Sequence, residues 1–150
     1  MVKIYEEGSE FKIGKAAVLK DGEDVTIIAN GIMVYEALKA GDLLKEKGIS
    51  ARIVDMFTLK PIDLFCVIES AKKTGAVVTA ENHNIINGLG SAVAEVLCEN
   101  FPVPLERVGV QDKFGEVGSQ DYLMDRFGLR AEEICKKAVR VIERKASAAV

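Results

Sequence analysis

The sequence predicts an α/β fold in which a mostly parallel sheet is covered by helices on both faces. Short runs of consecutive apolar residues, typical of strands buried on both faces, alternate with amphipathic stretches about ten to fifteen residues long, typical of connecting helices. The pair Asp21-Gly22 joins the first two apolar runs and predicts a hairpin, which requires at least one antiparallel strand. A chain of 150 residues without internal repeats is long enough for one domain with a buried core.

The first half of the chain predicts three strands and two helices. VTIIA, at 25–29, is apolar on consecutive positions, as expected of a strand covered on both faces. The helix after it is supported by Val34 and Leu38 at helical spacing and by Gly48 as a C-terminal stop. The polar residues 1–12 are a lead-in or linker, and the domain itself extends from 13 to 150. Its first elements are strands over 15–20 and 25–29, a helix over 32–48, a strand over 51–56 and a helix over 63–73.

Turn and cap residues delimit the later helices. Pro61 and Asp63 introduce the helix over 63–73, and Gly75 ends it. The predicted apolar face of this helix consists of Leu64, Val67, Ile68 and Ala71. Ser119 is the expected N-cap of a short helix that ends at Gly128. The remaining elements are strands over 75–81 and 105–110 and helices over 88–101, 119–128 and 131–146.

Composition and charge exclude several classes of function. The net charge of −3 and the pI of 5.3 argue against nucleic-acid binding, which needs a clustered basic surface. No apolar run approaches the ~20 residues of a membrane span, and the start lacks the hydrophobic core of a signal peptide. The unpaired spacing of Cys66, Cys98 and Cys135 predicts reduced, buried thiols in a cytoplasmic protein. With a single histidine and no cysteine pair, the sequence offers no zinc site.

The stretch ENHNIINGLGSAV, at 81–93, contains the strongest candidates for chemistry. Glu81 and His83 are predicted in a loop after a buried strand, where a carboxylate could orient an imidazole, but the sequence supplies no nucleophile beside them. The glycines do not fit the dinucleotide fingerprint, because Val93 occupies the position of its third small residue. We therefore assign no catalytic residue, and expect at most unspecific anion binding at the start of the following helix.

The small residues that begin this helix allow another backbone to approach closely. Gly88, Gly90 and Ser91 could pack against the domain's own sheet or against a second chain, and spacing alone does not separate these alternatives. After the last strand, Asp112 and Gly115 lie in a polar stretch that by itself indicates only a plain connection between strand and helix.

Three stretches together resemble the C-terminal domain of transketolases. They are KIGKAAVLKDGEDVTIIANG at 12–31, ENHNIINGLGSAVAEVL at 81–97 and VGVQDKFGEVGSQDYLMDRFGL at 108–129. The resemblance extends from about Phe11 to the last helix and is closest to the separately encoded C-terminal halves found in some prokaryotes. More distantly, the chain is similar to the last domain of deoxyxylulose phosphate synthase and of 2-oxo acid dehydrogenase beta subunits.

The resemblance implies a three-layer fold with a five-stranded mixed sheet whose first strand is antiparallel. In the family, thiamine diphosphate and Mg²⁺ lie between two preceding domains, at a dimer interface. This chain is therefore expected to bind no cofactor or metal and to be inactive in isolation. Its implied role is structural, supporting a homodimeric assembly with the cofactor-binding domains or subunit of the same enzyme. The complete enzyme would transfer a two-carbon ketol unit between sugar phosphates.

Two groups of residues match the family's motifs and are expected to face the rest of the enzyme. They are Glu81, His83, Gly88, Gly90 and Ser91 in the first group and Asp112, Phe114, Gly115 and Gly118 in the second. Asn87 replaces a family glycine, and asparagine tolerates left-handed φ, so the turn can still form. Val117 replaces a serine and removes a hydroxyl. A related thiamine enzyme and a stand-alone interaction module remain the alternative interpretations.

Overall fold

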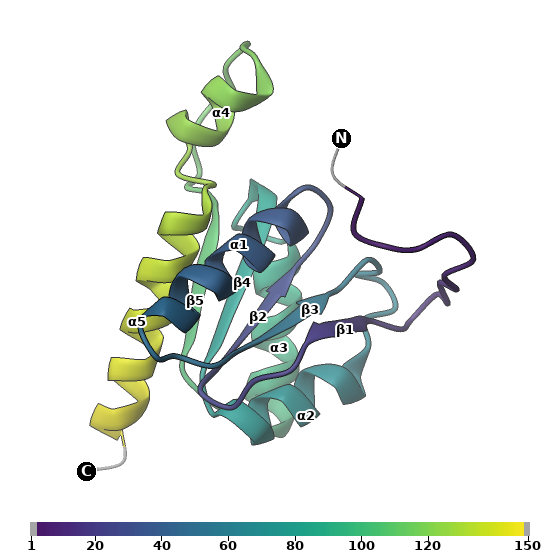
Figure 1. Ribbon diagram of the computed structural model, residues 1–150, viewed down its shortest axis with the longest axis vertical. Coiled ribbons are helices and arrows are strands. Elements are labelled where there is room, and N and C mark those ends of the chain that lie inside the picture. Colours follow the sequence, from purple (N-terminus) through teal and green to yellow (C-terminus); the bar gives the residue numbers. More distant parts are fainter. Residues whose placement is uncertain (1–2, 149–150) are drawn as a thin grey trace.

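A computed structural model describes residues 3–148 as one five-stranded sheet between two layers of helices (Figure 1). The strands lie in the order β1-β3-β2-β4-β5, and β1 is the antiparallel one. These findings confirm the predicted fold class. The elements are β1 (Ala17–Lys20), β2 (Val25–Ala29), α1 (Met33–Glu46), β3 (Ala51–Asp55), α2 (Leu64–Thr74), β4 (Val77–Asn84), α3 (Leu89–Asn100), β5 (Leu105–Val110), α4 (Gln120–Arg126) and α5 (Ala131–Ala148).

The predicted hairpin at Asp21-Gly22 is wrong, although its antiparallel strand exists. β1 pairs with β3, not with β2, and Gly22 does not adopt the positive φ of a tight hairpin turn. Gly22 instead crosses the start of β3, where an added Cβ would lie 2.3 Å from the carbonyl carbon of Ala51. Asp21 is bound there by Lys73 and Arg52, and the hydrogen bond from Lys73 is the main reason that its pKa falls to about 2. Glycine is therefore required at position 22 because the chain passes too close to the backbone of β3 to leave room for a side chain.

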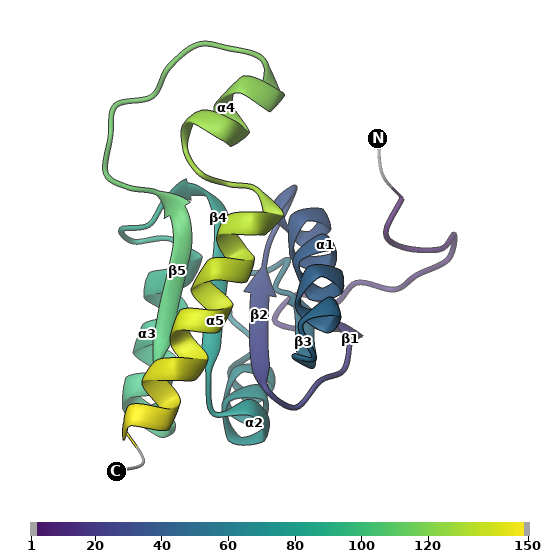
Figure 2. The same ribbon diagram turned by 60° about the vertical axis from the view of Figure 1, so that its left-hand side comes forward.

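Each face of the sheet carries its own apolar core. On one face, α1 and α5 cover residues such as Ile27, Ile53 and Val78; on the other, α2 and α3 cover Ile28 and Val54 (Figures 1 and 2). Consecutive strand residues therefore point into different cores, which explains the uninterrupted apolar runs in the sequence. Among residues 3–148, no helix has the length and apolarity needed to cross a bilayer.

The sequence predicted the helix ends more accurately than it predicted which side chains are buried. Asp63 caps α2 by accepting the amide hydrogen of Cys66, Ser119 caps α4 by accepting that of Tyr122, and Gly75 ends α2 with a left-handed φ of 65°. The predicted burial is wrong for three helix residues whose side chains face outward. Leu64 and Cys98 are exposed and Cys66 is only partly buried, whereas Cys135 is buried as expected.

The lead-in packs against the end of β3 through aromatic contacts. The Tyr5 hydroxyl donates a 2.6 Å hydrogen bond to Asp55 Oδ2. The Phe11 ring meets the Tyr5 ring edge-on at 4.7 Å and the Phe57 ring at 5.2 Å. Ile4 packs beside the core on the α1 face. These contacts hold the segment before residue 13 in a defined position on the domain.

Replacing Asp55 by asparagine should raise the melting temperature at neutral pH. Asp55 is buried, its Oδ1 has no partner within residues 3–148, and burial raises the pKa of its carboxyl group. Because the folded-state pKa exceeds the unfolded value of ~3.9, the charged form opposes folding, and stability is lost as the pH rises through the folded pKa. The side-chain amide of the substituted asparagine would still accept the Tyr5 hydrogen bond without this charge.

Thermal denaturation of both proteins between pH 4 and pH 8 measures the effect. The advantage of Asp55→Asn should shrink toward pH 4, where the wild-type carboxyl group becomes neutral. Asp42→Asn, which changes an exposed carboxyl group, is the control. A destabilised Asp55→Asn variant with the same deficit at every pH would contradict the burial argument.

Candidate functional site

Glu81 and His83 lie within a strand, not in the predicted loop. β4 continues to Asn84, because its last residues pair with the end of β5, where Asn84 is opposite Val110. Glu81 is only 1% exposed, whereas His83 is exposed. The two side chains therefore have different environments, and the structure provides no acid–base pair from them.

The Glu81 carboxylate caps helix α3 from inside the domain. Its Oε2 accepts the amide hydrogen of Leu89 at 2.8 Å, and its Oε1 accepts that of Gly90 at 2.9 Å. A negative charge is favourable at a helix N-terminus, where amide hydrogens lack partners within the helix. Both amides are already occupied, which corrects the expectation that this helix start could bind an outside anion.

The glycines beside Glu81 serve packing within the chain. A Cβ on Gly88 would lie 1.9 Å from Glu81 Oε2. A Cβ on Gly90 would lie 2.6 Å from Arg107 Cδ and 2.9 Å from Thr79 Oγ1. Of the two alternatives left open by the sequence, close packing on the domain's own sheet accounts for both glycines.

The turn before α3 forms as the sequence indicated. Asn87 adopts a φ of 62°, in the left-handed region that asparagine tolerates. Its amide hydrogen is donated to Ser91 Oγ at 2.9 Å. Ser91 is partly buried, and its hydroxyl supports the local turn through this hydrogen bond.

The second motif lies in an exposed loop, residues 111–119, beyond the end of β5. Asp112 has a φ of 45°, and its Oδ1 accepts a 3.1 Å hydrogen bond from Asn84 Nδ2, which joins the two motifs at one edge of the sheet. Phe114 is 97% exposed and Val117 103% exposed. Gly115 lies in open space.

Contacts with α4 hold this exposed loop in place. The Glu116 carboxylate accepts hydrogen bonds from the Tyr122 hydroxyl at 2.7 Å and from Arg126 Nε at 2.8 Å. The Tyr122 bond is the main reason that the pKa of Glu116 is lowered. Gly118 packs on Tyr122, since an added Cβ would lie 2.4 Å from the ring. The sequence did not reveal this Glu116 network, because its residues follow no recurring spacing.

The loop and α4 extend beyond the carboxyl ends of the parallel strands, away from the sheet (Figures 1 and 2). A cavity of about 580 Å³ lies between α4 and the sheet. It is lined by apolar side chains with a few polar groups: Ile32, Asn82, Val110, Gly115, Glu116, Gln120, Leu123, Met124, Phe127 and Leu129. Carboxyl ends of strands are where open α/β sheets place their ligands and contacts. This edge is the candidate functional site.

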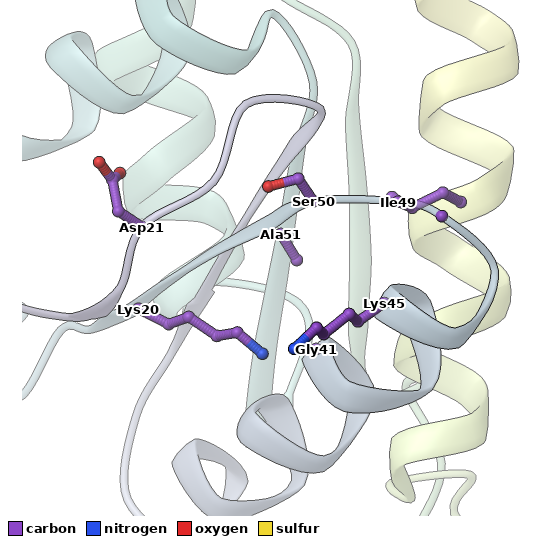
Figure 3. A pocket seen from close by; sticks show the side chains of 8 residues that line it. Lys20, Asp21, Gly41, Lys45, Ile49, Ser50 and Ala51 are labelled. Carbon is purple, nitrogen blue, oxygen red and sulfur yellow. The ribbon is translucent and has the colours of Figure 1, made fainter.

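A second cavity, of about 370 Å³, lies at the opposite edge, where β3 begins. The side chains of Lys20 and Lys45 extend toward each other in front of Gly41 (Figure 3). Lys20 is paired with Asp42 at 2.9 Å. The polar side chains among its lining residues are Lys20, Asp21, Lys45 and Ser50, and none of the motif residues lies in it.

A site for thiamine diphosphate and Mg²⁺ within residues 3–148 would need a cluster of metal ligands and a free helix start. No group of three or more His, Cys, Asp or Glu side chains converges there in a way that could hold a metal ion. Four helix starts that could receive a diphosphate are occupied by Asp63, Glu81, Ser119 and Glu36; the last accepts the amide hydrogen of Ala131 at 2.8 Å. The start of the fifth helix, α1, has no side-chain cap, and no metal-holding group lies beside it among the described residues.

Comparison with known proteins identifies relatives along nearly the whole chain. A family model described as the C-terminal domain of transketolase matches residues 14–134. A 6-deoxy-6-sulfo-D-fructose transketolase subunit of Clostridium sp. (strain MSTE9) is 58% identical over 144 residues, which cover 96% of this chain and 45% of that protein. A 1-deoxy-D-xylulose-5-phosphate synthase of Trichormus variabilis is 36% identical over 151 residues, covering 99% of this chain and 24% of that protein.

A solved structure confirms the fold at high similarity. It is described as a split gene transketolase in the form of an inactive beta4 tetramer, and it has a TM-score of 0.93 and 47% identity. The match covers 96% of this chain and 47% of that chain, so our chain spans less than half the length of these relatives. From the family match and the shared five-stranded fold, we conclude that the chain belongs to the transketolase C-terminal domain family.

Proposed function

We propose that this chain is the C-terminal domain of a split transketolase and that it holds the enzyme's parts together. The complete enzyme, in the cytoplasm, would transfer a two-carbon ketol unit between sugar phosphates, as in the pentose phosphate pathway. Thiamine diphosphate and Mg²⁺, bound by the preceding domains, would supply the electron sink for the carbanion. The isolated chain would be inactive. The complete enzyme would be a homodimer, in which each half consists of this chain and the cofactor-binding domains.

The observation that carries this proposal is the exposed loop. Phe114 and Val117 are apolar and almost fully solvent-exposed, yet Glu116, Gly118 and Asp112 hold the loop through internal contacts. Solvent-exposed apolar side chains on a loop that internal contacts hold in one conformation are typical of a surface that a partner covers. Of the motif residues, His83 and Phe114 would meet the partner, whereas Glu81, Gly88 and Gly90 would shape the edge from within.

Phe114→Asp should weaken assembly without affecting the fold. Because Phe114 contacts solvent, the melting temperature of the variant should stay within about 2 °C of wild type, as for ordinary surface substitutions. Association with the cofactor-binding domains, expressed as a separate polypeptide and measured by sedimentation, should weaken at least tenfold. Ketol transfer by the mixture should fall in proportion to the complex lost. Lys47→Ala, at an exposed position after α1 and outside both motifs, is the matched control.

The same mixture separates the alternative functions. Formation of 1-deoxy-D-xylulose 5-phosphate, without ketol transfer between sugar phosphates, would assign the chain to the synthase branch that its 36% identical relative represents. A wild-type chain that stays monomeric beside the cofactor-binding domains would support a stand-alone module and overturn the proposal.

A further inference from the structure

The turn before α3 contains the dipeptide Asn87-Gly88, whose two residues can react with each other. Asparagine is a thermolabile residue, because the backbone nitrogen of the next residue can attack its side-chain amide carbon. Glycine as the next residue presents that nitrogen without a Cβ beside it and with few restrictions on its backbone. The sequence contains this dipeptide twice, at Asn30-Gly31 and at Asn87-Gly88. The fold gives the two copies different surroundings.

The reacting groups of Asn87-Gly88 are accessible. Asn87 is exposed to solvent and borders a cavity of about 520 Å³. Its backbone amide hydrogen is donated to Ser91 Oγ at 2.9 Å, and the Gly88 carbonyl accepts the amide hydrogen of Ala92 at 3.1 Å. Among residues 3–148, neither the Asn87 side-chain amide nor the Gly88 amide hydrogen has a hydrogen-bond partner. Both the attacked carbon and the attacking nitrogen are therefore free to meet.

Asn30-Gly31 is held more tightly. Asn30 directly follows β2, and its side-chain Oδ1 is buried. The Asn30 backbone amide donates to the Ala80 carbonyl at 3.3 Å, and the Asn30 carbonyl accepts the amide hydrogen of Met33 at 3.1 Å. An attack within this dipeptide needs rotation of the Asn30 backbone and side chain, which burial and both hydrogen bonds oppose. The same dipeptide thus serves as a control inside the same chain.

We propose that Asn87 is a site of spontaneous deamidation and that isoaspartate formed there disrupts the start of α3. The Gly88 nitrogen forms a bond to Asn87 Cγ, and the side-chain nitrogen leaves as ammonia with the proton that the Gly88 nitrogen loses. Water then opens the five-membered succinimide at either of its two carbonyl carbons. One opening gives aspartate, and the other gives isoaspartate, whose main chain passes through the side chain and is one atom longer. The reaction consumes only water, needs no partner and is independent of the proposed function.

The start of α3 has no room for a longer main chain. A Cβ on Gly88 would lie 1.9 Å from Glu81 Oε2. The same carboxylate accepts the amide hydrogens of Leu89 and Gly90 at 2.8 and 2.9 Å. An additional main-chain atom before Gly88 must push this glycine against Glu81 or displace the two amides from their acceptor. We therefore expect the isoaspartate form to melt several degrees below the fresh protein.

Mass spectrometry of the aged chain tests the reaction. The 150-residue protein is incubated in water enriched in oxygen-18 at pH 7 and at pH 9, and is then digested in ordinary water. Residue 87 should gain one dalton from the change of amide to acid and two more from the incorporated oxygen, in separable aspartate and isoaspartate forms. The rate should rise with pH, because the attacking nitrogen must lose its proton. It should be roughly tenfold higher at Asn87 than at Asn30, since exposed turns tolerate such change.

Two variants separate the reaction from its consequence. Asn87→Gly keeps the positive φ without strain and should show no mass change at this position. Asn87→Asp adds the charge without lengthening the main chain and should melt within about 2 °C of the fresh wild type. Absence of isoaspartate at residue 87, or equal rates at Asn87 and Asn30, would overturn the proposed site. An isoaspartate form that melts like the fresh protein, or like a destabilised Asn87→Asp, would overturn the effect of the longer main chain on α3.

Discussion

Replacing Glu81 by alanine should lower the free energy of unfolding by roughly 3–5 kcal/mol, because two buried amide hydrogens lose a charged acceptor. The carboxylate is 1% exposed and binds the amides of Leu89 and Gly90 at the start of α3. Water cannot replace it without opening the packing between α3 and β4. In a domain of this size the change corresponds to a fall in melting temperature of ~10 °C.

Urea and thermal denaturation, followed by circular dichroism, measure this loss. Glu81→Gln should lose less, because the amide oxygen of glutamine can accept one of the two hydrogens while its NH₂ group cannot accept the other. Glu95→Ala, an exposed carboxylate on the same helix, should change stability by no more than ~0.5 kcal/mol. A Glu81→Ala variant as stable as Glu95→Ala would show that the cap is dispensable.

Gly22→Ala should destabilise the fold by several kcal/mol, on the order of 3 or more, because the added methyl group overlaps backbone atoms. An alanine Cβ would lie 2.3 Å from the Ala51 carbonyl carbon, 2.6 Å from its oxygen and 2.6 Å from the Arg52 nitrogen. Backbone atoms of β3 cannot rotate aside as a flexible side chain would. The first residues of β3 or the crossing at Gly22 must therefore move, which strains the ion pair between Asp21 and Arg52.

The matched control for stability is Gly115→Ala, since nothing lies within 4 Å of the Cβ that it adds. Both variants are compared with wild type by thermal denaturation and by the soluble yield of each protein. The Gly22 variant should show low yield and an early transition, whereas the Gly115 variant should match wild type. Equal stability of the two variants would rule out the backbone clash as a constraint on this position.

Much of the fold could be predicted because its signals are local. The apolar runs of the strands, Gly75 after α2 and Ser119 before α4 each act within a few residues of their own position. Asn87 could likewise be anticipated, since its φ of 62° depends on its own side chain tolerating that conformation. The transketolase C-terminal resemblance added that the sheet has five strands and that the first is antiparallel, whereas the strand order came only from the structure.

The candidate site was only partly predictable. The motif residues Asp112 and Phe114 were identified, but the roles of Glu116, Tyr122 and Arg126 were not, because their hydrogen bonds form only once α4 folds back over the loop. The exposure of Leu64 was missed for a similar reason. Its periodicity suits a buried face, yet in the first turn of α2 it remains 37% exposed, because periodicity does not show how far the neighbouring elements extend over a helix end.

The sequence by itself determined the alternation of strands and helices, most helix ends and the family. Only the tertiary structure decided that Gly22 lies against β3 and that Glu81 caps α3 from within β4. The physical reason is the same in both cases. Periodicity and turn propensity act between neighbours in the chain, whereas strand partners, a carboxylate's hydrogen-bond donors and the room for a Cβ are set by segments that meet only when the sheet assembles.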